Sequence, residues 1–586
     1  MRNGGAGHAL TLGTAAMLLA TPGAQAQVAP PGQRPPTREE IERVPTTDAP
    51  PAESRLTVEG GIERSPCPLA DPRFANVTVT VRGARFAGLE GIDPALVRPA
   101  FEPYLGRQVP IAVVCEIRDV AATLLRRAGY LAAVQVPAQR IDDGVVSFDV
   151  LLARLVSVRV RGDIGPSEGL IGRLVGRLAD PARPFNQRTA ERSLLLARDL
   201  PGYDIRLVLR PAGGTPGEVT GDVTVQRLRG ALDLNIQNFG SRQVGRWGGL
   251  LRAEAFDLLG AGDRLTAGVF QTADFREQTV AQGSYDAWLG ASGLTAGLRV
   301  AHAWTRPGTG NDDPFRARTL IAGGQIAYPI VRSQAGDVRI SGGLELIDQR
   351  LRFNEIRLST DRLRVATLRL SALEIDRASI AGVGRYSAQD PRWSAGVSVE
   401  LRQGLDVLNA GSYCNLLLSL GCPSGADLQA TVIRAEGEAA YRVVPDLELA
   451  VAPRGQYAFS RVASYEQFSL GNYTVGRGYE PGTAVGDSGY AVSAELRYGR
   501  LRSGPAVQVQ PFAFVDAGWA YRRGPSLGID DPVSLVSVGG GVRASLANRA
   551  RLDGTVAVPL DRGPFQTKKN AVRFLVSLTT RLLPWR

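Results

Sequence analysis

The sequence predicts a membrane all-β barrel of about 16 antiparallel strands, preceded by two α+β domains. Helical periodicity ends near residue 227, and residues 228–586 read as runs of alternating polar and apolar residues. An export signal occupies the N-terminus, and no later apolar stretch reaches the roughly 20 residues of a helical membrane span. Because lipid offers no water to backbone groups, membrane strands need a closed sheet. A soluble β-sandwich or propeller is the alternative, although no blade-length repeat supports it.

The N-terminal region reads as a signal followed by a tether. Residues 1–26 combine one early positive charge, the apolar stretch "ALTLGTAAMLLA" and a small-residue AQA cleavage site, a pattern typical of export. A short buried helix is the alternative. Residues 27–73 are rich in proline and polar residues, which predicts a mobile tether. Within it, "TREEIERV" has the composition of two helical turns, with Thr37 as N-cap.

Residues 74–154 and 155–227 repeat one order of strands and helices. In the first unit "NVTVTVRGA" predicts a strand, and Asp93 caps a helix that begins at Pro94. The stretch "EIRDVAATLLRRAGYLAA" predicts an amphipathic helix. Its apolar face consists of Ile117, Val120, Leu124 and Leu125. In the second unit "GLIGRLVGRL" and "NQRTAERSLLLARDL" supply the helices. The repeat indicates a tandem module rather than a single enzyme fold.

Residues 228–586 predict the barrel. The connections alternate between short turns, such as "VPD", and longer polar loops rich in glycine. This asymmetry is typical of outer-membrane barrels, which turn tightly in the periplasm and loop widely outside. Tryptophans near strand ends suit the interfacial girdles or, equally, ordinary packing. They are Trp247, Trp288, Trp304, Trp519 and Trp585. The C-terminal "LVSLTTRLLPWR" is expected to run past the last strand.

Four cysteines in an exported chain predict two disulfides. We expect Cys67 to pair with Cys115 and Cys414 with Cys422, because the two pairs lie far apart in sequence. Buried free thiols are the alternative. No close cluster of cysteine and histidine suggests a metal site, and no cofactor is predicted. His302 is the only histidine after the signal and has no supporting Ser-His-Asp motif, so neither a catalytic residue nor an enzymatic activity is predicted.

The formal net charge of +11 bears on the class of partner. Nucleic acid is not expected, because the arginines are spread along strands and form no basic run. A polar barrel lumen and a surface that faces acidic outer-membrane lipid account for the charge. The chain is expected to be a monomer.

The stretch "VGRGYEPGTAVGDSGY" lies in a long predicted connection, residues 461–488. Its glycines permit the backbone conformations that a hairpin folded back into a confined lumen needs. In "FAFVDAGWAY", Phe514, Asp516 and Gly518 share one face, and the other face suits lipid. Asp516 therefore points inward, where arginine is the best bidentate partner. We expect Arg477 to reach it; a solvated loop arginine is the alternative.

"VGRGY", "GDSG" and the later "FVDAG" together resemble the paired signature of two-partner secretion transporters, the TpsB or ShlB/FhaC/HecB hemolysin secretion/activation family. In that family a Val-Arg-Gly-Tyr/Phe tetrad at the tip of a lumen loop pairs with a Phe-x-Asp motif on the barrel wall. Here a glycine separates Val475 from the arginine, while the arginine, glycine and tyrosine are retained. The resemblance implies a lumen-loop motif of Gly476, Arg477, Gly478, Tyr479, Gly486, Asp487 and Gly489, with a wall partner of Phe514, Asp516 and Gly518.

The resemblance covers nearly the whole mature chain. It implies that residues 74–154 and 155–227 are POTRA domains, and "NFGSRQVGRW…LLGAGDRL" resembles the family's first barrel hairpin. The family's N-terminal plug helix has only the short "TREEIERV" as its counterpart. The implied function is an outer-membrane transporter whose periplasmic POTRA domains recognise a secreted TpsA-like adhesin or hemolysin. An assembly factor of the same superfamily is the alternative, and a passive porin does not explain residues 75–227.

Overall fold

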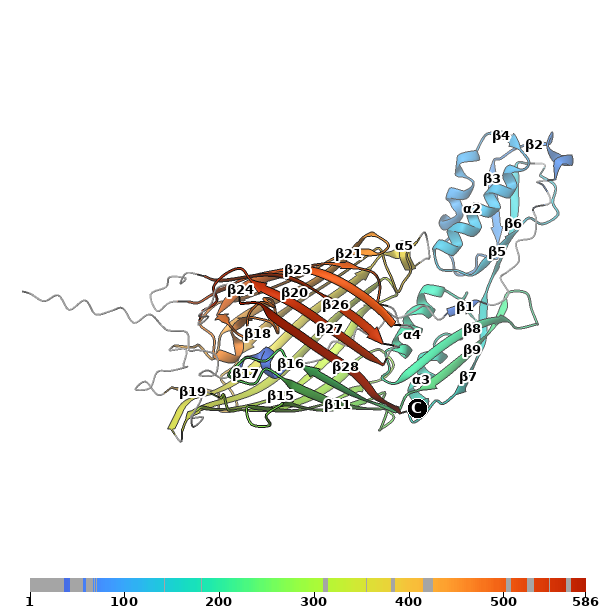
Figure 1. Ribbon diagram of the computed structural model, residues 1–586. Helices are drawn as coiled ribbons and strands as arrows, with labels where there is room; N and C mark the ends of the chain where they lie inside the picture. Colours follow the sequence, from blue (N-terminus) through green and yellow to red (C-terminus); the bar gives the residue numbers. More distant parts are fainter. Residues whose placement is uncertain are drawn as a thin grey trace, which may run out of the picture.

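A computed structural model describes residues 36–42, 56–58, 67, 69, 71–141, 143–180, 182–308, 315–354, 356–380, 385–414, 425–501, 507–523, 532–546, 549–564 and 571–585. These residues form a barrel with two small domains beyond one of its mouths (Figure 1). None of the described helices is long and apolar enough to span a membrane.

The barrel is a closed antiparallel sheet of 16 strands, which confirms the predicted fold class. β18 and β19 both pair with β17 and count as one strand. The barrel strands are β10 (Gly230–Gln237), β11 (Gly248–Phe256), β12 (Arg264–Thr272), β13 (Gln278–Trp288), β14 (Thr295–Thr305), β15 (Phe315–Arg332), β16 (Gly336–Phe353), β17 (Ile356–Ile375), β18 (Trp393–Gly404), β19 (Gly411–Cys414), β20 (Thr431–Val444), β21 (Leu447–Ala458), β24 (Ser488–Tyr498), β25 (Val507–Tyr521), β26 (Val533–Leu546), β27 (Ala550–Pro559) and β28 (Arg573–Trp585). A short helix, α5 (Arg377–Ile380), lies between β17 and β18.

The first and last strands close the barrel. β10 pairs with β28 from Gly230 opposite Trp585 to Gln237 opposite Ser577. Inside the lumen, the Asn235 amide donates hydrogen bonds to the hydroxyls of Ser577 (3.0 Å) and Thr579 (2.8 Å). The expectation that the C-terminal residues run past the last strand is therefore wrong, because their backbone groups complete the sheet.

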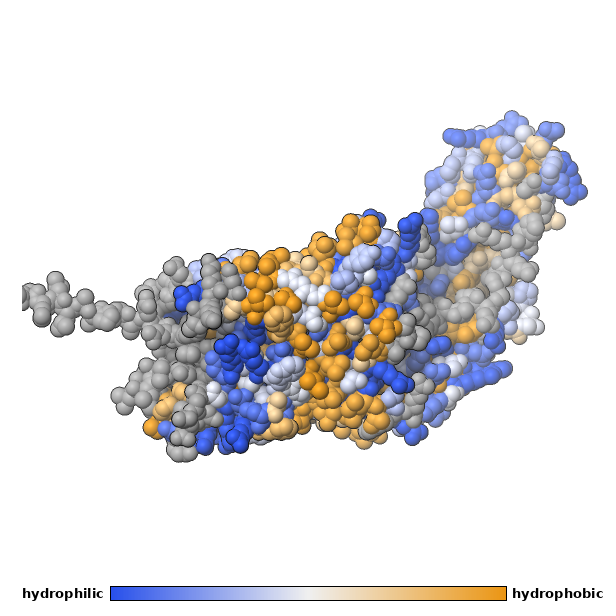
Figure 2. Space-filling view, in the orientation of Figure 1, coloured by the Kyte–Doolittle hydropathy of each residue, from blue (hydrophilic) through white to orange (hydrophobic). Residues whose placement is uncertain are grey.

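Side chains alternate between the lumen and the outer face. On β25, Phe514 is 4% exposed, whereas its neighbour Val515 is 50% exposed. Figure 2 shows the resulting apolar band on the visible face of the barrel, with hydrophilic residues on either side of it. His302 and Trp304 stack on each other with ring centroids 4.0 Å apart, at positions that alternate with the buried Ala303.

The first small domain (71–152) has two β-sheets, ordered β3-β6-β5 and β2-β4, packed against one long helix. Its elements are η2 (Pro72–Phe74), β2 (Thr78–Thr80), β3 (Gly83–Ala87), η3 (Pro94–Ala100), η4 (Glu102–Tyr104), β4 (Gln108–Pro110), α2 (Val113–Arg127), β5 (Ala132–Gln135) and β6 (Val145–Leu152).

The sequence predictions for this domain differ from the structure in three details. The predicted first strand is split into β2 and β3, because Arg82 donates its N–H to Gly144 between them. The helix capped by Asp93 is a 3-10 helix, which suits a segment in which Pro99 has no N–H to donate. Val120 is 41% exposed and does not belong to the buried face of α2, which includes Ile117 and Leu125.

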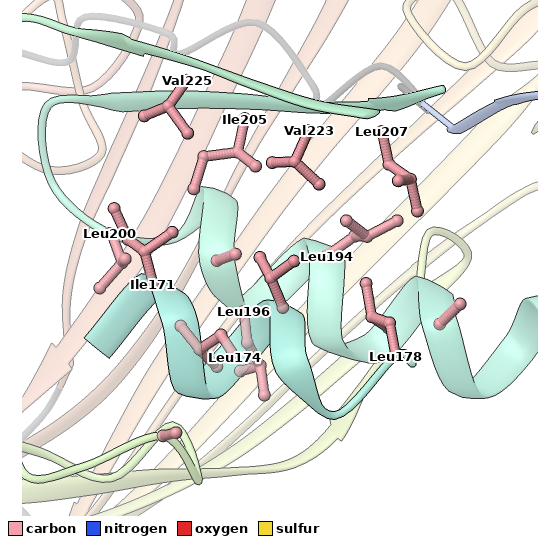
Figure 3. Close-up of a cluster of buried hydrophobic side chains, with 14 of the residues drawn as sticks. Ile171, Leu174, Leu178, Leu194, Leu196, Leu200, Ile205, Leu207, Val223 and Val225 are labelled. Atoms are coloured by element: carbon pink, nitrogen blue, oxygen red, sulfur yellow. The ribbon is translucent and has the colours of Figure 1, made fainter. Parts of the chain in front are cut away.

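The second small domain (154–227) has two helices packed on one face of a sheet. Its elements are β7 (Arg154–Gly162), α3 (Glu168–Gly176), α4 (Gln187–Arg198), β8 (Tyr203–Pro211) and β9 (Glu218–Arg227). Figure 3 shows the core between the two layers, where Ile171, Leu174 and Leu194 from the helices face Ile205 and Val223 from the strands. These residues are nearly all fully buried, so this domain has a continuous hydrophobic core of its own.

Two short pieces of the predicted tether have defined places. Helix α1 (Arg38–Ile41) lies inside the barrel, where Ile41 packs among lumen residues of the wall (Figure 1). Thr37 and Glu40 form a reciprocal capping box at its start. Strand β1 (Leu56–Val58) pairs in parallel with β8 and extends the sheet of the second small domain. The tether thus connects the lumen with the edge of a domain outside the barrel.

The second small domain is fixed to the barrel by a buried carboxylate. Asp257, in the turn after β11, accepts hydrogen bonds from the backbone and hydroxyl of Ser167 and from the Tyr203 phenol. Burial, and after it the bond to Asp257, raises the pKa of Tyr203, so that its hydroxyl stays protonated and donates. Trp288 is 9% exposed in the core of this domain. Trp288 therefore does not belong to an interfacial girdle, and the alternative of ordinary packing holds for it.

A second contact between this domain and the barrel is ionic. Arg332, at the end of β15, lies between two carboxylates. Its Nη2 faces Asp199, and its Nη1 faces Asp337. The Arg332 fork binds Asp199 with two bonds of 2.8 Å. Gln334 in the adjacent turn donates its N–H to Glu191 (2.6 Å). Contacts on two sides of the mouth hold the domain against the barrel.

Cys67 and Cys115 form a disulfide with Cα atoms 6.0 Å apart, as predicted. It ties the end of the tether to α2 of the first small domain. Cys422 lies outside the described residues, so the Cys414–Cys422 bridge stays a prediction.

Replacing Cys115 with serine is expected to destabilise the first small domain by about 2–4 kcal/mol, because the bridge restricts the unfolded chain. Limited proteolysis of the full-length protein on a temperature ramp would show cleavage of this domain at a lower temperature. Cys67→Ser serves as the matched variant and should behave alike. Equal protease resistance of both variants and the unmodified protein would contradict the prediction.

Candidate functional site

The connection between β21 and β24 folds back into the barrel. It contains η6 (Ser464–Glu466) and a small hairpin of β22 (Phe468–Leu470) and β23 (Ala484–Gly486). Leu470 and Tyr479 are fully buried, and the hairpin packs against the wall residues Ala520 and Leu535. We call residues 459–487 the lumen loop.

Arg477 lies at the tip of the lumen loop and binds Asp516 on β25 with a two-pronged contact. Its Nε donates to Oδ2 (2.9 Å) and its Nη2 to Oδ1 (2.7 Å). The backbone N–H of Arg477 donates to the same Oδ2 (2.9 Å). The Asp516 side chain is 1% exposed and the Arg477 side chain 16%. Charge-assisted bonds in such a shielded place are stronger than surface pairs.

Three wall residues complete the environment of the guanidinium. Glu495 accepts from Nη1 of Arg477 (2.5 Å), and Ser493 accepts from Nη2 (2.9 Å). The ring of Phe514 lies under the guanidinium, with its centroid 3.5 Å from the guanidinium carbon. Glu495 and Ser493 were not predicted from the sequence. Their alternation along β24 places both inside, but the register with β25 is needed to bring them to Asp516.

The two residues after Arg477 fit the wall closely. A Cβ on Gly478 would lie 2.8 Å from the Ser537 Cβ and 2.9 Å from the Pro559 nitrogen, so no side chain is accommodated there. The Gly478 N–H donates to the Ser537 hydroxyl (3.2 Å). The Tyr479 hydroxyl donates to the backbone oxygen of Val536 (2.7 Å) and accepts the backbone N–H of Asp561 (3.1 Å). The tip of the lumen loop is thus held by its close packing against the wall as well as by the ion pair of Arg477.

The remaining predicted residues shape the loop and its base. Gly476 has φ +116°, a conformation that side chains disfavour. Asp487 accepts the backbone N–H groups of Val462 (3.0 Å) and Arg523 (2.9 Å), which closes the base of the loop. Among the other predicted glycines, a Cβ added to Gly486, Gly489 or Gly518 would lie less than 3 Å from a neighbouring atom.

A second ionic cluster ties the lumen loop to another part of the wall, at β16 and β18. Arg402 on β18 is 1% exposed and donates to Glu466 of the loop (2.7 and 2.9 Å). It also binds Glu345 (2.7 Å) and Glu400 (2.8 Å) on the wall. Arg434 adds a further bond to Glu466 (2.9 Å). Each carboxylate of this group has a guanidinium partner, which a buried ionic group requires.

The helix α1 lies against this cluster. Glu42 accepts from the Tyr465 hydroxyl of the lumen loop (2.8 Å) and from Arg299 on β14 (3.0 Å). Glu39 binds Arg454 on β21 (3.1 Å). The lumen loop and the N-terminal segment therefore contact each other and share partners on the wall.

Space remains beside these two segments. A cavity of about 700 Å³ is bounded by α1, the lumen loop and the lumen faces of β10, β27 and β28, and its lining is mostly charged or polar. A smaller one of about 250 Å³ lies on the β11–β14 side of α1. Within the described residues, no group of three or more His, Cys, Asp or Glu side chains could hold a metal ion. The lumen is thus polar and is partly filled by two segments, α1 and the lumen loop.

Comparisons with known proteins agree with this geometry. The sequence pattern of the haemolysin secretion/activation protein ShlB/FhaC/HecB family matches residues 222–544. CdiB from Escherichia coli has a similar structure, with a TM-score of 0.68 at 15% identity over 93% of this chain and 95% of that one. CdiB from Acinetobacter baumannii gives 0.61 at 18% identity over 89% and 91%. At the threshold applied, no curated protein sequence matches the chain.

The family pattern covers most of the barrel, and the structural similarity extends over the two small domains, which are POTRA-like. An outer-membrane barrel with its POTRA-like domains in the periplasm follows from the family and the fold. The chain belongs to the ShlB/FhaC/HecB haemolysin secretion/activation family of two-partner secretion transporters.

Proposed function

We propose that the protein binds one exported partner, a TpsA-like adhesin or hemolysin, with its POTRA domains and passes it through the barrel in extended form. The lumen loop held by Arg477 on Asp516 carries this proposal, because a passive pore needs no such segment inside it. The loop and α1 together obstruct the channel at rest and yield when the partner enters.

The edges of the small domains suit capture of an extended chain. The edge of β8 accepts the extended segment β1 in parallel register, from Leu56 opposite Leu207 to Val58 opposite Leu209. In the first small domain, β3 and β5 are the edge strands of the sheet. Strand addition to such edges gives affinity through main-chain hydrogen bonds. A partner's extended segment is bound in this way before it enters the pore.

Deleting the gene tests the proposal. One large protein is expected to disappear from the culture medium, while the other outer-membrane barrels stay at normal abundance, and the full-length gene restores secretion. An unchanged set of secreted proteins, together with failing barrel insertion, would favour an assembly factor.

A cross-link across the closing seam separates the same two functions. Asn235 and Thr579 lie opposite each other in the β10–β28 pairing. With both replaced by cysteine and oxidised, secretion through the lumen is expected to continue, because the seam stays shut. The Leu234→Cys single variant, treated with the same oxidant, is the control. Loss of secretion on cross-linking, restored by reductant, would indicate passage through an opened seam.

A further inference from the structure

An arginine cluster lies on the outer face of the barrel near the extracellular ends of β15 and β16. Arg318 lies opposite Arg350 and Arg316 opposite Arg352 in the pairing of these strands. All four are exposed, and they alternate with buried residues such as Ala317 and Leu351, which face the lumen side. We call Arg318, Arg350 and Arg352 the outer arginine cluster.

Like charges directly opposite each other on paired strands are destabilising unless something neutralises them. Over the described part of the chain, neither an ion pair nor a hydrogen bond to a carboxylate joins any member of the outer arginine cluster. The nearby Asp348 is bound by Arg364 (2.8 Å). Lumen arginines such as Arg402 have carboxylate partners within 3 Å. Among the residues that the structure describes, the outer arginine cluster therefore has no carboxylate counter-ion.

The cluster lies directly beside the apolar band. Arg318 lies opposite Trp304, the exposed aromatic at the extracellular end of β14. The next outward positions towards the membrane centre are Leu320 on β15 and, facing it, Asp348 on β16, which Arg364 neutralises. Leu346 follows Asp348, and Leu320 and Leu346 are 40% and 38% exposed. Figure 2 shows hydrophilic residues meeting the apolar band on the visible face of the barrel. The guanidinium groups thus lie at the boundary where lipid headgroups begin.

We propose that the outer arginine cluster binds the phosphate groups of a phosphorylated glycolipid of the outer leaflet, of the lipid A type. Each guanidinium presents a fork of donors that matches phosphate oxygens in pairs. The phosphates neutralise the facing pair Arg318 and Arg350, and the acyl chains lie on Leu320 and Leu346. This inference rests on the outer-membrane barrel alone and does not depend on the proposed function.

The test measures binding of fluorescent bis-phosphorylated lipid A to the full-length protein in detergent micelles. Replacing Arg318, Arg350 and Arg352 together by alanine is expected to weaken binding roughly tenfold or more, since each removes one charge at the membrane surface. The matched control removes three exposed arginines of the small domains, Arg126, Arg127 and Arg173, and should bind as the unmodified protein does. Unboiled gel mobility verifies that each barrel is folded.

Dephosphorylated lipid A with the same acyl chains isolates the headgroup contribution. The unmodified protein is expected to bind it as weakly as the triple variant binds the phosphorylated form. A triple lysine variant, which keeps the charge but loses the fork, should fall between the two. Unchanged binding in the triple alanine variant, or equal affinity for both lipids, would overturn the proposal.

Discussion

Replacing Asp516 with alanine is expected to reduce secretion of the partner at least tenfold while the barrel still folds. The change leaves Arg477, now facing only Glu495 and Ser493, without three of its hydrogen bonds. Removing one partner of a buried ion pair costs about 3–5 kcal/mol. That is about a hundredfold or more in the equilibrium between a held and a released lumen loop. Secreted protein in the medium and single-channel recordings would show the loss and a noisier pore.

Two companion variants sharpen this prediction. Arg477→Lys keeps the charge but not the fork, so it is expected to behave nearly like Asp516→Ala. Arg497→Ala removes a different guanidinium from Glu495 (2.7 Å) and does not touch the loop tip, so it should secrete normally. Normal secretion by a folded Asp516→Ala protein would disprove a functional role for the contact.

Deleting residues 36–42 is expected to raise the conductance of the pore severalfold. This segment fills lumen space with Ile41 and bridges the wall and the lumen loop through Glu42. Its removal joins the cavities of about 700 and 250 Å³ that flank α1. Planar-bilayer recordings measure the conductance, and growth in the presence of a large antibiotic such as vancomycin reports it in cells.

The control for this deletion changes the tether and leaves the segment intact. Replacing residues 44–50 with a glycine-serine stretch of equal length keeps Ile41 and Glu42, so conductance should stay at its resting value. A deletion variant with unchanged conductance would mean that the lumen loop alone closes the channel.

The contact between Arg477 and Asp516 could be anticipated from two sources: strand alternation fixes the face of Asp516, and the resemblance to the family's paired motifs points to the loop residue Arg477 as its partner. Asp516 shares a face with Phe514, and a carboxylate on that face needs a cation. Glu495 could not be anticipated in the same way. Its distance to Arg477 depends on the register of β24 against β25, which the alternation of either strand leaves open.

Contacts that join distant segments were beyond sequence reasoning. Nothing in a tether rich in proline singles out Leu56–Val58 as a strand, because its pairing comes from the edge of β8. Trp288 at a strand end reads equally as a membrane-facing or a packed residue, and only the docking of the second small domain decides between them. The ion pair of Arg402 with Glu466 likewise depends on how far the lumen loop descends.

The seam between β10 and β28 has a consequence for how this protein is made. Asp233 and Arg581, which meet there (3.1 Å), are 348 positions apart in the chain. Pairing over so long a separation is slow to form, because the chain entropy of closing it is lost before the contact is gained. Until β28 is in place, β10 has a partner on one side only, and a sheet formed by the earlier strands would have an unpaired edge there. The barrel can therefore close only once its last strand has been made and has reached the first.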